Sequence, residues 1–224
     1  MNKRRLAGLM CLTLSFTVLL AACGGTGSDA SAPPSAAPDD TTVETPSSQT
    51  DGENLFTPGT WLSDRGQYYF FDEGDSAGRI ASLEDGMGVG FTYTLSGTEA
   101  VFSLGGAGDS SPCTVSRDGD TVTLEWTDGT TEHLTYVSAQ GSDTFRFYSN
   151  QELAELALTY YKEQNGAQDN PNLTAAAQTN DDGSVSIQVY ENLGDHNSTA
   201  AWYTVDRLTG AGTDSAGAEV DLAG

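Results

Sequence analysis

The sequence predicts a mainly β fold followed by an α+β unit: a small up-and-down β-barrel or meander, then one helix packed on an antiparallel sheet of three or four strands. Two observations support this prediction. Residues 59–148 form short apolar–polar alternations separated by Gly, Asp and Ser turns about every ten residues, a spacing typical of all-β folds. Residues 149–166 instead show helical periodicity, and strand-like alternation resumes after residue 172. The chain therefore divides into a β module, 54–148, and an α+β module, 149–224.

The first 22 residues have the composition of a secretory signal peptide. Basic residues at positions 3–5 precede an apolar stretch over 6–20, and small residues precede Cys23. The quartet Leu-Ala-Ala-Cys that ends at Cys23 resembles the lipobox of bacterial lipoproteins. This resemblance implies cleavage before Cys23, a diacylglyceryl thioether on its sulfur, and a lipid-anchored protein on the extracytoplasmic face of the cell membrane. The alternative is an ordinary secretory signal in which Cys23 lies near the cleavage site by chance.

Residues 23–53 are predicted to form a disordered acidic linker after the lipidated Cys23. Between Ser28 and Asp51 the chain is dominated by Ser, Thr, Ala, Pro and Asp, with no aromatic and no basic residue. Such a segment buries too little apolar surface to offset the entropy lost on ordering. We expect the linker to hold a folded head away from the membrane surface.

The charge of the chain excludes several classes of partner. All 32 acidic residues follow Cys23, whereas three of the nine basic residues lie in the predicted signal. Six basic residues therefore remain against 32 acidic ones, a formal charge of −26. A chain so acidic repels nucleic acid and anionic lipid headgroups, so we expect no nucleic-acid partner. Beyond the signal and Cys23, only Cys113 remains, so no intramolecular disulfide is expected.

Nine short strands are predicted in the β module. They are centred on Trp61, Tyr69, Ile80, Phe91, Phe102, Thr114, Leu124, Leu134 and Phe145.

Two hairpins allow the strand register to be predicted, because the apolar residues of both strands must share one face. A two-residue loop at 96–97 sets Tyr93 opposite Ala100 and Phe91 opposite Phe102. In the later hairpin, a three-residue loop at 128–130 sets Leu124 opposite Leu134 and Val122 opposite Tyr136, with Gly129 or Thr130 in the left-handed conformation. A two-residue loop at 128–129 would instead set Leu124 opposite His133. Burial favours the three-residue loop.

Gly59-Thr60-Trp61, at the start of the first strand, resembles the G-x-W motif of lipocalins. The resemblance implies that Trp61 closes the base of a barrel and that the barrel carries a small apolar ligand. Trp61, Tyr69, Phe91 and Phe102 are the candidate lining residues. A barrel of such short strands can also be filled by its own side chains.

The run from Tyr68 to Phe71 places large rings on both faces of one strand. One pair must point into the module. We expect the other pair to be covered by the α+β module, the alternative being an exposed contact patch.

The α+β module begins with a predicted helix. Ser149 and Glu152 form a capping box, and an apolar stripe follows it. The stripe consists of Leu153, Leu156, Ala157, Tyr160 and Tyr161, and Asn165-Gly166 ends the helix. The strands are predicted over 173–179, 184–191, 201–206 and 219–222.

The segment 203–210 resembles the end of PepSY-like repeats, in which a strand leads into an Asp-x-x-Thr-Gly turn. Asp206 can accept backbone N–H groups in that turn, and Gly210 provides the positive φ. The resemblance implies a small envelope module of regulatory or inhibitory type without catalytic residues. A cystatin-like fold would have the same order of elements.

Few side chains suit catalysis or metal binding. His133 is expected on the solvent face of its strand, and His196 in a polar loop beside Asp195. Cys113 is expected to pack in the core. The Gly-rich run at 105–108 precedes no helix and therefore does not indicate a phosphate site. Acidic clusters at 72–75, 118–120 and 181–182 are ordinary turn chemistry, with structural Ca²⁺ as the alternative.

These observations predict a non-catalytic binding or interaction role at the extracytoplasmic membrane surface, with no catalytic residue, metal or cofactor. The partner would be an envelope protein or a small ligand, besides the membrane reached through Cys23. Carriage of a small apolar ligand in the β module is the first alternative, and an envelope hydrolase is the second.

Overall fold

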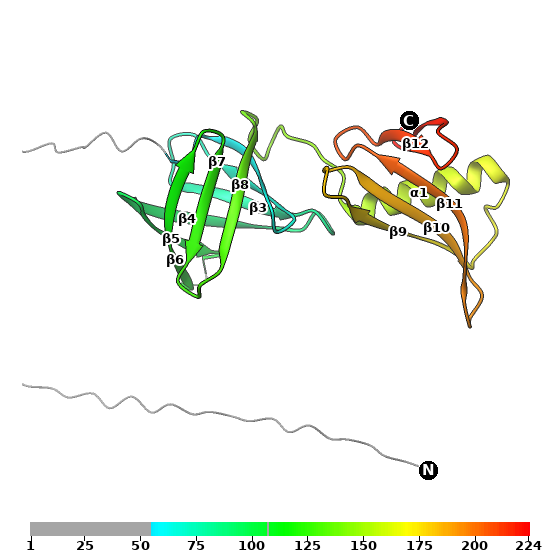
Figure 1. Ribbon diagram of the computed structural model, residues 1–224, viewed down its shortest axis with the longest axis horizontal. Helices are drawn as coiled ribbons and strands as arrows, with labels where there is room; N and C mark the ends of the chain where they lie inside the picture. The colour runs from blue at the N-terminus through cyan, green and yellow to red at the C-terminus, as the bar shows by residue number, and fades with distance from the viewer. Residues whose placement is uncertain (1–54, 107) are drawn as a thin grey trace, which may run out of the picture. The chain divides into compact units, whose positions relative to one another are not determined.

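The computed structural model describes residues 55–106 and 108–224. This part of the chain is mainly β, with one helix (Figure 1). The predicted signal peptide, Cys23 and the linker 23–53 lie outside the described residues.

The β module is a closed eight-stranded barrel, as predicted for an up-and-down architecture. Each strand pairs with the next in antiparallel fashion, and β1 closes the barrel by pairing with β8. The strands are β1 (Gly59–Ser63), β2 (Gln67–Phe71), β3 (Ala77–Ser82), β4 (Gly88–Ser96), β5 (Glu99–Leu104), β6 (Ser110–Asp118), β7 (Thr121–Trp126) and β8 (Thr131–Ser138).

The ninth strand predicted around Phe145 is absent from the described barrel, because pairing of β1 with β8 leaves no free edge for it. The segment after β8 instead covers the outside of β2. Phe145 and Phe147 pack on Tyr68, at ring-centroid distances of 5.1 and 4.9 Å. Tyr68 and Phe70 are thereby buried, whereas the other two rings of the run point into the barrel. The outer rings are buried, as predicted, but the covering residues belong to the segment after β8 and not to the α+β module.

The predicted register between β4 and β5 is wrong by two residues. The structure pairs Tyr93 with Phe102 and Leu95 with Ala100, around the two-residue loop Gly97-Thr98. Gly97 takes φ +61°, which favours glycine at the first position of such a loop. Because the shift preserves the alternation, the predicted inward face is still the inward face.

The hairpin between β7 and β8 has the predicted loop length but a different register. Val122 pairs with Leu134 and Leu124 with Glu132, rather than Leu124 with Leu134. The loop residues are 127–129, and the Trp126 N–H donates to the Thr130 carbonyl at 2.9 Å. Gly129 has φ +86°, as predicted for the left-handed position. The Asp128 carboxylate fixes the turn, because it accepts hydrogen bonds from the N–H and hydroxyl of Thr130.

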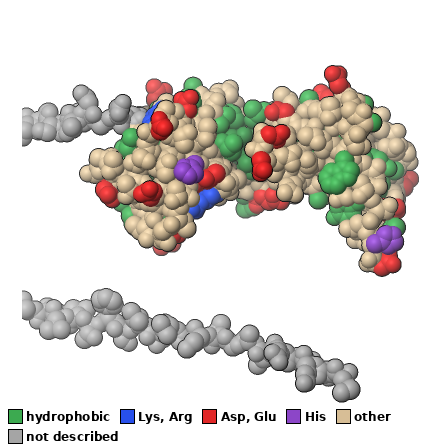
Figure 2. Space-filling model, viewed as in Figure 1, with side chains coloured by type: hydrophobic (Ala, Val, Ile, Leu, Met, Phe, Trp, Pro, Cys, Tyr) green, Lys and Arg blue, Asp and Glu red, His purple; other side chains and the backbone are tan. Residues whose placement is uncertain are grey.

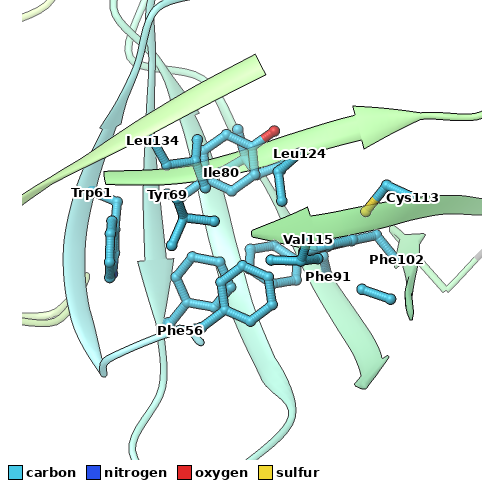
Figure 3. Close-up of a cluster of buried hydrophobic side chains, with 13 residues drawn as sticks. Phe56, Trp61, Tyr69, Ile80, Phe91, Phe102, Cys113, Val115, Leu124 and Leu134 are labelled. Atoms are coloured by element: carbon cyan, nitrogen blue, oxygen red, sulfur yellow. The ribbon is translucent and has the colours of Figure 1, made fainter. Parts of the chain in front are cut away.

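The barrel interior is packed with aromatic and aliphatic side chains (Figure 3). Phe56 precedes β1 and enters the barrel, where its ring stacks on Phe71 with centroids 4.5 Å apart. Trp61 is fully buried, and its Nε1–H donates to the Thr57 carbonyl at 2.8 Å. The Arg117 guanidinium lies 5.3 Å from the Trp61 ring centroid. The buried core consists of Phe56, Trp61, Tyr69, Phe71, Ile80, Phe91, Ala100, Phe102, Cys113, Val115, Val122, Leu124 and Leu134.

The second module is an antiparallel sheet of five strands with helix α1 packed on one face. The sheet order is β13-β12-β11-β10-β9. The elements are α1 (Asn150–Asn165), β9 (Leu173–Thr179), β10 (Val185–Asn192), β11 (Asn197–Val205), β12 (Ala211–Asp214) and β13 (Glu219–Asp221).

The local signals predicted for this module are found. Ser149 and Glu152 form the capping box, and Gly166 ends the helix with φ +62°. Asp206 Oδ1 accepts the N–H groups of Leu208 and Thr209 at 2.9 and 3.0 Å. Two features were not predicted: strand β12, whose short Ala-Gly-Thr-Asp sequence carries no alternation signal, and the extension of β11 back to residue 197, which follows from its pairing with β10.

Candidate functional site

A depression of about 490 Å³ opens at one end of the barrel. It lies at the end that carries the β1–β2, β5–β6 and β7–β8 connections. Its wall combines apolar and aromatic side chains with a polar rim. The lining residues are Arg65, Gln67, Tyr69, Ile80, Val89, Phe102, Leu104, Ser110, Ser111, Pro112, Trp126, Thr127, Asp128, Thr130 and Glu132.

Glu132 is the unusual member of this lining, because its carboxylate is only 2% exposed. The Ser63 hydroxyl donates to Glu132 Oε1 at 2.5 Å, and Trp126 Nε1–H donates to Oε2 at 3.2 Å. The guanidinium Nε of Arg65 lies 3.8 Å from Oε2. A buried carboxylate is costly without such donors, so these three side chains make its burial possible.

Two titratable groups near Glu132, the Tyr69 phenol and the Cys113 thiol, are kept uncharged. Tyr69 is buried beside it, and burial together with the Glu132 charge raises the pKa of the Tyr69 phenol far above its usual value. Burial, followed by the charges of Glu99 and Glu132, raises the pKa of the Cys113 thiol to about 11. Both groups are therefore neutral at physiological pH. The lining carries two carboxylates, Glu132 and Asp128, and one guanidinium, Arg65, among aromatic rings and a neutral phenol.

The predicted lining residues fall into two sets. Tyr69 and Phe102 line the depression. Trp61 and Phe91 belong to the packed interior and do not line it (Figure 3). Contact of any of the four with a ligand stays a prediction.

Sequence reasoning missed the polar cluster at the depression, formed by Arg65, Trp126 and Glu132 in its lining and by Ser63 behind Glu132. The sequence does contain a signal for Glu132. It lies two residues before the inward-facing Leu134 in the same strand, so strand alternation alone predicts that its side chain points into the barrel. The three partners could not be found this way, because they approach Glu132 from other segments.

The other candidate groups do not converge on a site. His133 is exposed on the outer face of β8, where its Nδ1 lies 3.1 Å from the Thr123 hydroxyl. The exposed His196 Nδ1 lies 2.7 Å from Asp195 Oδ1. Among residues 55–106 and 108–224, no three His, Cys, Asp or Glu side chains are grouped so as to hold a metal ion.

Comparison with models of protein families, with curated proteins and with solved structures finds no match to this chain. In the described ranges, α1 is neither long nor apolar enough to span a bilayer.

Proposed function

We propose that this protein is a non-catalytic binding protein, anchored by lipid on Cys23 to the extracytoplasmic face of the cell membrane, and that the barrel depression is its binding site. The anchoring part rests on the signal-like sequence 1–22 and the lipobox-like quartet that ends at Cys23. The binding part rests on one observation: an open apolar depression with a fully partnered carboxylate at its wall. Ligand sites commonly have this composition, a mostly apolar wall with a few placed polar groups.

The ligand that fits is small and largely apolar, with a hydrogen-bond donor or a positive charge at one end. The rings of Tyr69, Phe102 and Trp126 would contact the apolar part. Ring faces and the Glu132 carboxylate both attract a positive group. An anionic ligand is disfavoured by Glu132, by Asp128 on the rim and by the net charge of −23.

Binding at the mouth is favoured over carriage deep within the barrel. Below the depression, Phe56 stacks on Phe71 and contacts Phe102 edge to face, so aromatic rings fill the axis of the barrel. Nothing in the lining favours the hydrolase alternative over binding, because His133, His196 and Cys113 lie outside the depression.

The binding proposal is tested with N-phenyl-1-naphthylamine, a neutral aromatic amine whose fluorescence rises in an apolar site. We expect saturable binding that octylamine displaces more effectively than octanoate. Ser111→Phe, which fills the depression, should abolish binding, whereas Thr114→Phe, exposed on the same strand, should leave it unchanged. Unchanged binding by Ser111→Phe, or stronger displacement by octanoate, would refute the proposed site.

The anchoring proposal is tested by mass spectrometry of the protein extracted from cell membranes. We expect a chain that begins at Cys23 and carries a diacylglyceryl group, and we expect Cys23→Ser to release the protein into the medium. An unmodified Cys23 thiol on protein that is free in the culture fluid would overturn it.

A further inference from the structure

One face of the second sheet carries no charged side chain on its three long strands, β9, β10 and β11. Helix α1 packs on the opposite face, against residues such as Ile187 and Tyr203. Strand alternation and register place one uncharged set on the open face. The set, which we call the neutral face, is Thr174, Ala176, Gln178, Ser186, Gln188, Tyr190, Thr199, Trp202 and Thr204.

The absence of charge here contrasts with the chain as a whole, of which 18% is charged and which has a formal charge of −23. Figure 2 shows mainly uncharged and some hydrophobic surface over the middle of this sheet, with acidic side chains towards its margin. In so acidic a chain, an exposed sheet face that contacts only solvent would be expected to carry Asp and Glu side chains. Its neutrality therefore matches an uncharged partner.

The neutral face carries the kinds of side chain that bind sugar hydroxyls. Trp202 is 45% exposed on β11, the middle strand of the five-stranded sheet, and lies opposite Gln188, whose other neighbour is the small Ala176. Gln188 Nε2 donates to the Thr199 hydroxyl at 2.6 Å, so the carboxamide is held beside the indole. Hydroxyls and carboxamides both donate and accept hydrogen bonds, as sugar hydroxyls require. The negative face of an indole attracts the polarised C–H groups of a sugar ring.

A shallow depression of about 730 Å³ extends the neutral face at one end. Thr174 and Tyr190 belong to both features. The depression adds two carboxamides and an exposed leucine, and every residue in its lining is uncharged. These residues are Pro171, Asn172, Thr174, Tyr190, Asn192, Leu193 and Gly194.

We propose that the neutral face and this depression bind a neutral glycan chain of the cell envelope. Trp202 would stack on one sugar ring, and Tyr190 would contact a further unit of the chain. The proposal uses the extracytoplasmic location proposed above but not the barrel depression, so either site can fail without the other.

The test measures retention of the full-length protein, in detergent, on insoluble chitin and cellulose, which are neutral, and on their charged derivatives chitosan and carboxymethyl cellulose. We expect retention on at least one neutral polymer, weakened about tenfold or more by Trp202→Ala, as for an exposed aromatic residue that anchors a binding surface. Gln188→Glu, which keeps the shape of the face but adds a charge, should weaken it as well. Val137→Ala, which truncates an exposed apolar side chain on β8 of the barrel, is the control and should bind as the wild type does.

Circular dichroism and the thermal midpoint confirm that each variant folds, which is expected because Trp202 is half exposed and Gln188 lies on the surface of the sheet. The proposal is wrong if neither neutral polymer retains the protein, if folded Trp202→Ala and Gln188→Glu bind as tightly as the wild type, or if retention is stronger on the charged polymers.

Discussion

The Ser63 hydroxyl donates a 2.5 Å hydrogen bond to Glu132 Oε1, joining β1 to β8 inside the barrel. Ser63→Ala removes one of the donors that hold a buried carboxylate. We expect the free energy of unfolding to fall by about 2 kcal/mol, the cost of leaving a buried charged group short of a hydrogen bond. Urea denaturation measures it. Ser116→Ala, on the exposed face of β6, is the control and should change stability by less than about 0.5 kcal/mol.

Gly78 in β3 is expected to tolerate no side chain. A Cβ there would lie 2.0 Å from the Phe70 carbonyl oxygen and 2.6 Å from the Phe91 ring. Gly78→Ala should therefore destabilise the barrel by roughly 1–3 kcal/mol, the range for overpacking. Gly90→Ala on the adjacent strand is the matched control, because its nearest neighbour would be 3.8 Å away. Equal thermal midpoints for the two variants would contradict the packing described here.

Phe56 fills the axis of the barrel, so its removal should leave a cavity. Phe56→Ala is expected to cost about 3–5 kcal/mol in the free energy of unfolding. The cavity would be lined by Phe71, Phe102 and Tyr93, and an apolar cavity stays dry and accepts benzene. We therefore expect benzene-saturated buffer to raise the thermal midpoint of this variant but not of the wild type. Failure of benzene to do so would indicate that the interior collapses around the gap.

Because the Cys113 thiol is buried, we expect the free energy of unfolding to fall at alkaline pH. Its pKa in the folded chain is about 11, above the value of about 8.5 for an unfolded thiol. The neutral thiol therefore contributes fully below about pH 8.5, and the contribution disappears as pH rises towards 11, because the unfolded state ionises first. Urea denaturation between pH 8 and 10 should show this fall in the wild type and a smaller one in Cys113→Ala.

Labelling provides an independent check on Cys113. In a chain with Cys11→Ser and Cys23→Ser, the remaining thiol should react with iodoacetamide at pH 8 only after unfolding in urea, because the folded thiol is buried. Rapid labelling of the folded chain would contradict the burial.

Arg207 is 4% exposed and connects three segments of the chain. Its guanidinium donates to the Tyr148 carbonyl at 2.8 Å, to Asn150 Oδ1 at 3.0 Å and to the Thr179 hydroxyl at 2.6 Å. Arg207→Met should cost about 3 kcal/mol, because it leaves buried acceptors unpaired. Arg207→Lys should recover only part of the loss, since an ammonium cannot reproduce the fork of a guanidinium. Denaturation that shows lysine and arginine to be equivalent would exclude this geometric role.

Much of the fold follows from local patterns that need no knowledge of distant residues. Alternation identifies the inward residues of the barrel, such as Phe91 and Phe102, and a register shift of two leaves them inward. The capping box at Ser149 and the turn at Asp206 form as predicted, because their hydrogen bonds join residues close in sequence. The apolar stripe of α1 likewise predicts which side of the helix meets the sheet.

Features that depend on distant segments appeared only in the tertiary structure. The ninth strand was excluded by the pairing of β1 with β8, which determines that no edge remains near Phe145. The partners of Glu132 are Ser63, Arg65 and Trp126, of which two lie more than 60 residues away. The neutral face exists because pairing aligns Trp202 with Gln188 and Ala176. The sequence alone determined which face of its strand or helix each of these side chains occupies. Only the tertiary structure decided which residues of other segments lie beside it, because strand alternation carries no information about the pairing of distant segments.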